Sequence, residues 1–495
     1  MPAAPIMNTR SMTDSLQSAV EILQDRLYYI ALGPDARPDS SKRVVYKDGS
    51  TQKRQIHYFN IDNELVYWNF FLDFGPLNLG QLYRFCAKLN QKLSRGNTKY
   101  TEKILCFYSS TAPSKRANAI FLVCAWQVLY LDRTPEEAYH GFRENADMMS
   151  LPSKNCSSPP AASVAGPVVS TMTLPPFHDA SPCPCTYDLS ILDCLRGMSK
   201  ARMYGYFDFS TFDVEEYEYF EQVENGDLNW IMKDKILAFA GPHFKKTMSP
   251  EGYCTLTPRD YIPYFKQKNV GLVVRLNKKC YNEDDFRKAG IMHVEQYYLD
   301  GSCPPMKILQ KVLSAFEALP PSKAFAVHCK AGLGRTGTCI GAYMMKHYKF
   351  TAAEAIGWMR ICRPGCVIGP QQHFLQDLEQ RMWHEGDVMR LNPAQSRSLF
   401  KKRSSSLTCE DHGSMPNSSS RKQQKESKQK GGGRSSKSGG VLSALGFGSL
   451  TVREAHQELH SEQRADVVES REGQAESLLA RRGQLRQDLT TSARR

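Results

Sequence analysis

A cysteine followed six positions later by an arginine indicates the chemistry of this chain, in the stretch Val327-His328-Cys329-Lys330-Ala331-Gly332-Leu333-Gly334-Arg335-Thr336-Gly337. The spacing is typical of cysteine-dependent phosphatases, in which a thiolate attacks phosphorus. Glycines permit a tight turn, and the planar guanidinium of Arg335 matches two phosphate oxygens. We expect the Thr336 hydroxyl to donate to the sulfur, which would make Cys329 a better leaving group. The predicted phosphate-binding loop is Lys330, Ala331, Gly332, Leu333 and Gly334.

The flanking residues predict a strand–loop–helix unit around Cys329. Residues 324–327 are apolar and predict a short buried strand, and residues 336–347 predict a helix. Such a unit points backbone N–H groups and the positive end of the helix dipole at the loop, where they stabilise a thiolate or a phosphate dianion. A Walker-type nucleotide loop is excluded because no Gly-Lys-Ser/Thr closes the motif. The alternative, a structural cysteine beside a glycine-rich turn, leaves Arg335 and Thr336 unexplained.

Two further residues are candidates for acid–base chemistry. Asp300 is predicted to follow a strand ending at residues 297–299 and to begin a turn, where it could protonate the leaving oxygen and later activate water. The alternative is a plain turn or helix-capping aspartate. Gln371, with its neighbour Gln372, could position that water, although surface glutamines would look the same. The mechanism requires no metal or other cofactor, because arginine and amides supply the positive field.

Composition limits the other functions. The formal net charge of +13 gathers largely beyond residue 390, so the body is only mildly basic and predicts no nucleic-acid partner. The longest apolar run, residues 119–131, is too short to cross a membrane and predicts a buried helix. The first 17 residues lack an apolar segment and predict no secretory signal. The 15 cysteines indicate a reducing compartment. The pair Cys183 and Cys185 predicts no zinc site without further ligands nearby.

The chain contains an apparent duplication. Thr351-Ala352-Ala353-Glu354-Ala355 resembles Thr134-Pro135-Glu136-Glu137-Ala138, and the same offset places Ala112 opposite Cys329 and Asn118 opposite Arg335. We therefore predict an α/β chain of two tandem phosphatase-like domains, each a central sheet flanked by helices, with an inactive first domain and a catalytic second one. The alternative is a chance match of two ordinary strand–loop–helix units. The predicted segments are a flexible N-terminus (1–14), a non-catalytic domain (15–150), a Ser/Pro-rich insertion and linker helix (151–212), a catalytic domain (213–390) and a disordered basic tail (391–495).

Several motifs together resemble one family, the dual-specificity cell-division-cycle phosphatases that oppose cyclin-dependent kinases at mitotic exit. They are the loop around Cys329, then Arg360-Ile361-Cys362-Arg363-Pro364-Gly365, Gly369-Pro370-Gln371-Gln372-His373-Phe374 and Phe207-Asp208-Phe209-Ser210-Thr211-Phe212-Asp213. The resemblance covers roughly residues 15–390. It implies two tandem dual-specificity-phosphatase domains, with the active centre in the second.

The resemblance also implies substrates and locations. The substrates would be phosphoproteins made by proline-directed kinases, with phosphoserine before proline and a basic residue further along. Glu218 and Glu221 would contribute to an acidic groove for that residue, or else belong to a solvated acidic face. The nucleus or nucleolus, the centrosome or spindle, and the cytoplasm are the implied locations, and the tail is a candidate for binding regulatory or localisation partners. Three alternatives remain: an inositide lipid phosphatase, an RNA triphosphatase, and a non-catalytic phosphopeptide-binding scaffold.

Overall fold

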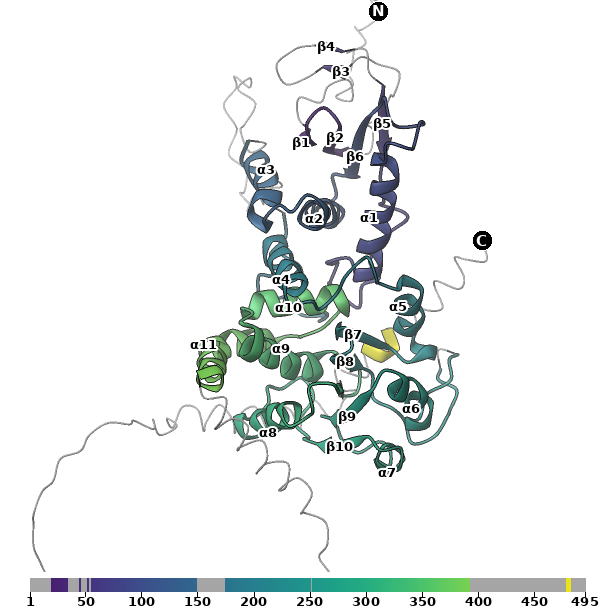
Figure 1. Cartoon of the computed structure of the whole chain (residues 1–495), viewed down its shortest axis with the longest axis vertical. Coiled ribbons are helices and arrows are strands. Elements are labelled where there is room, and N and C mark those ends of the chain that lie inside the picture. The colour runs from purple at the N-terminus through teal and green to yellow at the C-terminus, as the bar shows by residue number, and fades with distance from the viewer. Residues whose placement is uncertain are drawn as a thin grey trace, which may run out of the picture.

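The computed structural model describes residues 19–33, 44–45, 51–52, 55–148, 174–250, 252–391 and 478–481. Two α/β bodies are stacked along the long axis, and the helices α4 (Ile191–Met203) and α10 (Ala352–Cys362) lie between them (Figure 1). The predicted α/β class and pair of tandem domains are thus confirmed.

The first domain has a four-stranded sheet with the order β1-β2-β6-β5. Its central strand, β6, pairs in parallel with β2 and β5, and β1 is antiparallel at one edge. Two short strands, β3 (Val44–Val45) and β4 (Thr51–Gln52), pair separately. The remaining elements are β1 (Val20–Leu23), β2 (Leu27–Leu32), β5 (Ile56–Phe59), α1 (Leu79–Leu93), β6 (Ile104–Ser110), α2 (Pro113–Tyr130) and α3 (Pro135–Met148).

The second domain repeats this plan with one more strand, in the order β10-β9-β11-β8-β7. Here β11 is central and pairs in parallel with β8 and β9, whereas β7 is the antiparallel edge. The strands are β7 (Leu228–Met232), β8 (Ile236–Phe239), β9 (Val270–Arg275), β10 (Met292–Glu295) and β11 (Ala324–His328). The helices are α5 (Val214–Glu221), α6 (Pro258–Gln267), α7 (Asp284–Lys288), α8 (Met306–Glu317), α9 (Gly334–Tyr348), α10 and α11 (Pro370–Leu391).

The two domains share details beyond strand order. A capping box begins α10 at Thr351. The Thr351 hydroxyl accepts from the Glu354 N–H, and the Glu354 carboxylate accepts from the Thr351 N–H. Thr134 and Glu137 make the same reciprocal pair at the start of α3. Because such a box satisfies two N–H groups that a helix start leaves free, the aligned Thr-x-x-Glu motifs begin equivalent helices.

The predicted alignment fails in the loop between strand and helix. Cys329–Leu333 separates β11 from α9, whereas only Thr111 and Ala112 separate β6 from α2. Asn118 consequently lies inside α2 and donates to the Phe74 carbonyl at 2.6 Å, so it does not occupy the position of Arg335 near a helix start. A constant offset could not represent this shorter loop.

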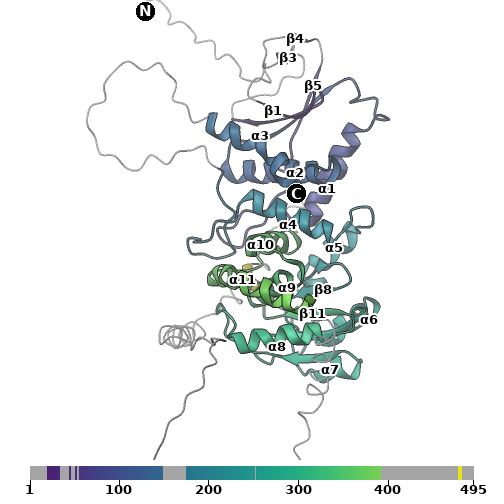
Figure 2. The same ribbon diagram turned by 60° about the vertical axis from the view of Figure 1, so that its left-hand side comes forward.

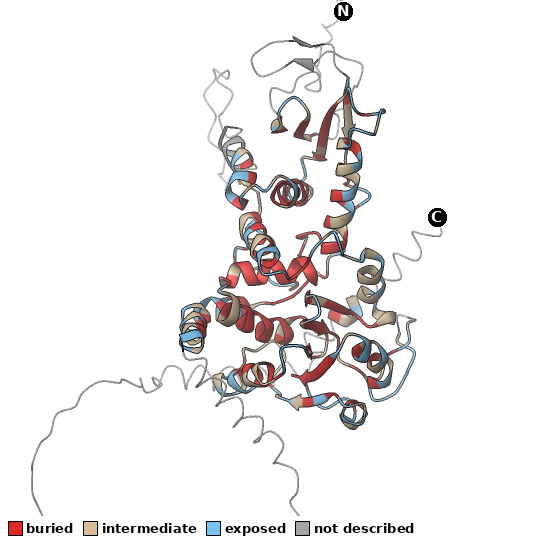
Figure 3. Ribbon diagram, in the orientation of Figure 1, coloured by how far each residue is buried: buried red, intermediate tan, exposed pale blue. Residues whose placement is uncertain are grey.

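A continuous hydrophobic core joins the domains. Both sheets and the helices α2, α9 and α10 are largely buried (Figure 3). The linker helix α4, which lies within the predicted linker segment 151–212, packs directly against α10 (Figure 2). A Cβ at Gly197 would lie 2.2 Å from the Glu354 carbonyl oxygen, and one at Gly357 would lie 2.9 Å from the Cys194 Cα. Glycine at both positions therefore permits the close crossing that packs the linker on the catalytic domain.

The predicted tail lies almost wholly outside the described residues, as do the N-terminal segment 1–14 and residues 151–173. The exception is Leu478–Arg481, a helical turn in which Leu478 is 2% exposed and belongs to the core. These four residues form a short helical turn within the tail that is predicted to be disordered. Among the helices described, none combines the length and apolar character needed to cross a bilayer.

Candidate active site

The Cys329 loop lies at the C-terminal end of the central strand β11, where the chain turns into α9. Cys329 is 2% exposed. Gly332 has φ +68°, and a Cβ there would lie 2.1 Å from the Phe239 carbonyl oxygen of β8. Only glycine fits this position, because both the left-handed backbone and the close approach exclude a side chain. The predicted phosphate-binding loop is therefore built against the neighbouring strand.

Arg363, to which the sequence motifs assigned no role, is hydrogen-bonded to the main chain of the Cys329 loop. It is fully buried, and its Nε and Nη2 donate to the carbonyls of Gly332 (2.8 Å) and Ala331 (3.0 Å). Asp227 and Asn229, on the neighbouring β7 side, pair with the same guanidinium at 2.8 and 2.7 Å. Arg363 therefore fixes the carbonyl oxygens of two successive residues in the predicted phosphate-binding loop.

Arg335 lies at the start of α9 and is 3% exposed. Its Nη1 donates to the Tyr298 carbonyl and its Nη2 pairs with Asp300 Oδ1, both at 3.0 Å. Burial alone would lower the pKa of Arg335, but the nearby charges of Cys329 and Asp300 raise it. Its Nε is buried with no hydrogen-bond partner among the described residues. A buried guanidinium N–H without an acceptor is costly, and a bound phosphate oxygen would satisfy it.

Thr336, directly after Arg335, is buried, and the hydrogen bond to the sulfur that the sequence predicts is not formed. Its Oγ1 has no hydrogen-bond partner within the described part of the chain. The hydroxyl is thus available for an acceptor that arrives during catalysis. The other loop residues differ in exposure, since Leu333 is fully buried whereas Lys330 is half-buried and its carbonyl accepts from the Gly241 N–H at 2.8 Å.

Asp300 is brought to Arg335 by a segment that leaves the sheet earlier than predicted. β10 ends at Glu295, so residues 297–299 are not a strand. The Tyr298 N–H still donates to the Leu276 carbonyl at 3.3 Å, and the Tyr298 hydroxyl donates to the Arg335 carbonyl at 3.0 Å. These bonds turn the chain across the Cys329 loop. They place Asp300 against the guanidinium that is expected to bind phosphate.

Gln371 connects three parts of the site. It is fully buried at the start of α11, and its Nε2 donates to the Ser302 carbonyl in the Asp300 loop at 3.0 Å. A Cβ at Gly334 would lie 2.7 Å from Gln371 Oε1, so this amide rests directly on the Cys329 loop. The surface alternative for Gln371 and Gln372 is therefore wrong: both are buried.

A buried hydrogen-bond chain behind Cys329 contains two histidines. His328 Nδ1 donates to the Cys329 carbonyl at 2.8 Å, its Nε2 accepts from the Tyr281 hydroxyl at 2.7 Å, and Tyr281 also bonds His293 at 2.8 Å. Burial lowers the pKa of both His328 and His293 to about 3. The fold therefore holds both imidazoles neutral.

This neutrality predicts a pH-dependent stability. Each histidine has a pKa near 6.5 when unfolded, so its contribution is complete above pH 6.5 and is lost as the pH falls towards 3. We expect His328→Gln to flatten the dependence of the unfolding free energy on pH below 6.5 by up to about 1.4 kcal/mol per pH unit. Denaturant unfolding between pH 7.5 and 5 measures this slope. His384→Gln, at an exposed histidine, should leave it unchanged, and an unaltered slope in His328→Gln would contradict the prediction.

The acidic residues of α5 lie at the boundary with the first domain. Both carboxylate oxygens of Glu218 accept from Arg84 of α1 at 2.5 Å, so its charge is already neutralised. Glu221 accepts from Asn78 Nδ2 at 3.0 and 3.1 Å and is half-buried. The structure thus places both residues beside the first domain. The ion pair between Glu218 and Arg84 is not needed for a groove that binds a cation of the substrate.

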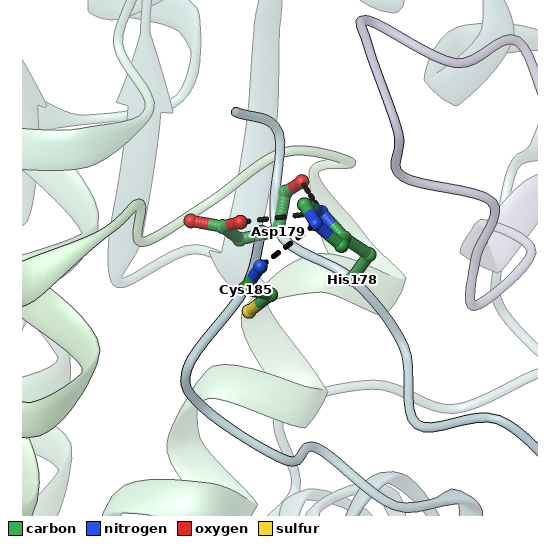
Figure 4. A group of neighbouring side chains, drawn as sticks. All are labelled: His178, Asp179 and Cys185. Carbon is green, nitrogen blue, oxygen red and sulfur yellow. Dashed lines mark hydrogen bonds and ion pairs between the residues drawn. The ribbon is translucent and has the colours of Figure 1, made fainter. Parts of the chain in front are cut away.

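Cys185 has neighbours that the sequence did not indicate. Donor atoms of His178, Asp179 and Cys185 all lie within 4.8 Å of one another (Figure 4). One histidine and one aspartate thus accompany Cys185, because the chain folds back on itself between residues 177 and 189 through an antiparallel bridge.

Comparisons with known proteins agree with this geometry. Residues 21–158 match the family model described as dual specificity protein phosphatase, N-terminal half, and residues 249–349 match one described as polymorphic toxin system, DSP-PTPase phosphatase. Dual specificity protein phosphatase CDC14A of Mus musculus is 46% identical over 79% of this chain and 57% of its own length. CDC14C of Homo sapiens is 44% identical over 70% of this chain and 72% of its own length.

A more distant relative, tyrosine-protein phosphatase cdc-14 of Caenorhabditis elegans, is 38% identical over 73% of this chain and 47% of its own length. The chain spans little more than half the length of the CDC14A relatives it matches. The aligned part nevertheless includes most of this chain and nearly three quarters of the CDC14C protein. The chain therefore belongs to the CDC14 family of dual specificity protein phosphatases.

Proposed function

We propose that the protein is a cysteine-dependent dual-specificity phosphatase that hydrolyses phosphoserine, phosphothreonine and phosphotyrosine in proteins. The observation that carries this proposal is the buried, unpartnered Nε of Arg335 at the mouth of the Cys329 loop. Its neighbours are a thiol, an aspartate and a ring of amides, and together they suit a tetrahedral dianion that has one ester oxygen to lose.

The first step forms a phosphocysteine. Cys329 Sγ attacks phosphorus in line, the bond to the substrate oxygen breaks, and Asp300 supplies the proton that this oxygen gains. Arg335 and the loop amides stabilise the equatorial oxygens. Asp300 forms an ion pair with Arg335 at 3.0 Å in the absence of substrate, so phosphate binding must compete for that guanidinium.

The second step hydrolyses the intermediate. A water oxygen attacks phosphorus, its proton passes to the Asp300 carboxylate, and the bond to sulfur breaks to release phosphate and the thiolate. The Gln371 amide lies between the Cys329 and Asp300 loops, where it can hold this water. The Thr336 hydroxyl is available to donate to the departing sulfur.

The finer specificity is also part of the proposal. The preferred site is phosphoserine followed by proline, with a basic residue downstream, as made by proline-directed kinases, and the role is to oppose cyclin-dependent kinases in cell division. The proposed locations are the nucleus or nucleolus, centrosome or spindle and cytoplasm, with the tail as a binding region for partners. The first domain, whose loop between β6 and α2 lacks a cysteine, is proposed to be non-catalytic.

Phosphate release from a phosphoserine-proline peptide tests the function directly. We expect turnover by the full chain without added metal, inhibition by vanadate, and a phosphorylated protein that acid quenching traps. An inositide phosphate assayed in parallel tests the lipid alternative. Binding of the peptide without any release of phosphate would support a scaffold and overturn the proposal.

The pairing of Glu218 makes the acidic groove testable. Glu221→Lys should lower kcat/KM about two- to fivefold for a peptide with lysine after Ser-Pro, as expected for one partly exposed charge pair, and should not affect a peptide with alanine there. Glu218→Gln should have less effect, because Arg84 already neutralises Glu218. Competition between the lysine peptide and the alanine peptide measures the ratio of their kcat/KM values for each variant. An unchanged lysine preference in Glu221→Lys would place the subsite elsewhere.

A further inference from the structure

The segment from Phe177 to Leu189 lies between the two domains. Phe177 is fully buried against the rings of Phe74 and Phe121 of the first domain, at centroid distances of 5.4 and 6.4 Å. Its carbonyl accepts from Arg360 of α10 at 3.3 Å. One end of the segment is thereby packed against the first domain and bonded to the catalytic domain at the same residue.

Asp179, two residues further on, contacts the part of the catalytic domain that carries Gln371. It is 1% exposed, and its Oδ2 accepts from the Gly369 N–H at 2.5 Å and from Gln372 Nε2 at 3.3 Å. Arg360 holds the other end of the Gln372 amide, donating to its Oε1 at 2.6 Å. The loop that leads into α11 is thus held on one side by Asp179 and on the other by Arg360.

Neighbouring side chains lie against the other oxygen of the Asp179 carboxylate. Ser181 Oγ donates to Asp179 Oδ1 at 2.8 Å, and His178 Nδ1 lies 3.3 Å from the same oxygen (Figure 4). The Cys185 N–H donates to His178 Nε2 at 3.0 Å. The imidazole proton therefore sits on Nδ1, which donates to the Asp179 main-chain carbonyl at 2.6 Å.

This arrangement argues against using the His178, Asp179 and Cys185 group as a metal site. Both imidazole nitrogens already have partners, and the carboxylate accepts on both oxygens. A cation would have to displace these bonds, including the bond that holds Gly369. The three residues instead form a hydrogen-bond network in which Asp179 holds the loop that carries Gln371.

We propose that Asp179 is a positioning residue for the second chemical step: it holds the Gly369–Gln372 loop so that Gln371 orients the water that hydrolyses the phosphocysteine. This inference rests on the proposed phosphatase function and extends it. It also assigns a role to the first domain, because Phe74 and Phe121 of that domain pack against Phe177 in the segment that carries Asp179. Asp179 takes no part in the direct contacts of Arg335 with Asp300 and Tyr298 on which the first step depends.

The requirement is for a carboxylate in particular. Three donors face it, the Gly369 N–H, Gln372 Nε2 and the Ser181 hydroxyl. An amide keeps only one oxygen and carries no charge, so it would accept more weakly from Gly369 and Gln372, and its N–H₂ would turn towards Ser181. Asp179→Asn, although nearly the same size, should therefore displace the loop.

Burst kinetics with p-nitrophenyl phosphate separate the two steps. For Asp179→Asn and Asp179→Ala we expect kcat to fall about 10- to 100-fold while kcat/KM stays within roughly threefold, as for a misplaced hydrolytic water and an intact first step. The burst of nitrophenol should persist, and the phosphorylated fraction trapped by acid should rise. Gln371→Ala should give the same split.

Matched controls make each outcome decisive. Asp188→Asn, at an exposed aspartate of the same segment, should behave as wild type. If Asp179→Ala fails to fold, the isosteric Asp179→Asn decides. Equal losses in kcat and kcat/KM, or no rise in trapped phosphoprotein, would overturn the positioning role. If the wild-type chain itself forms no phosphoprotein, the proposed function fails instead, and the two failures are thereby distinguished.

Discussion

Cys329→Ser should abolish turnover of the phosphoserine-proline peptide, with a loss on the order of 10⁴- to 10⁶-fold, as for removal of a catalytic nucleophile. A serine hydroxyl stays protonated at neutral pH and has no base within the loop. The phosphate-binding groups remain, because the loop amides, Arg335 and the hydrogen bonds from Arg363 to the loop carbonyls do not depend on the sulfur. Phosphopeptide affinity should therefore be retained, as calorimetric titration would measure.

The control is Cys254→Ser, which alters an exposed cysteine and should retain full activity. No phosphorylated protein should be trapped with Cys329→Ser. Turnover near the wild-type rate in this variant would exclude the covalent route. Loss of peptide binding together with turnover would indicate that the loop had collapsed.

Asp300→Asn should have the second-largest effect, and the effect should depend on the leaving group. A serine alkoxide needs a proton as it departs, whereas nitrophenolate does not. We expect a loss of roughly 10²- to 10⁴-fold in kcat on the phosphoserine peptide and less than about tenfold on p-nitrophenyl phosphate. KM should not rise, because the substitution removes the ion pair with Arg335 and leaves the guanidinium available to phosphate.

Steady-state kinetics on both substrates measure this difference, with Asp188→Asn again as the exposed control. Equal losses on the two substrates would remove Asp300 from the role of proton donor. A rise in KM would instead show that Asp300 holds Arg335 in its binding position.

Much of the site could be predicted because it is local in sequence. Cys329 and Arg335 are fixed in relation to each other by one strand–loop–helix unit, and hydrophobic patterning identifies such a unit. The helices predicted at residues 336–347 and 119–131 from the same patterning overlap α9 and the buried helix α2, although α2 begins six residues earlier than predicted. Asp300 and Gln371 were predicted as candidates, and the structure brings both to the Cys329 loop.

The supporting residues could not be predicted in the same way. Arg363 contacts Gly332 across 31 positions, and Asp179 contacts Gly369 across 190. No periodicity or spacing relates such pairs, because their proximity arises only when α10 and the segment after Phe177 pack on the catalytic sheet. The pairing of Glu218 with Arg84 has the same origin, since it spans 134 positions and depends on how α5 packs on α1.

The sequence by itself indicated Cys329 as the candidate nucleophile, Arg335 as the candidate phosphate-binding residue, and the tandem α/β plan, since short-range spacing and apolar periodicity are sufficient to specify a loop and its flanking elements. Only the tertiary structure decided how Arg363 holds the loop carbonyls, which acidic side chain is already neutralised, and how the first domain connects to Gln371. Those properties depend on hydrogen bonds and ion pairs between groups far apart in the chain. Such bonds form only where folding has removed competing water.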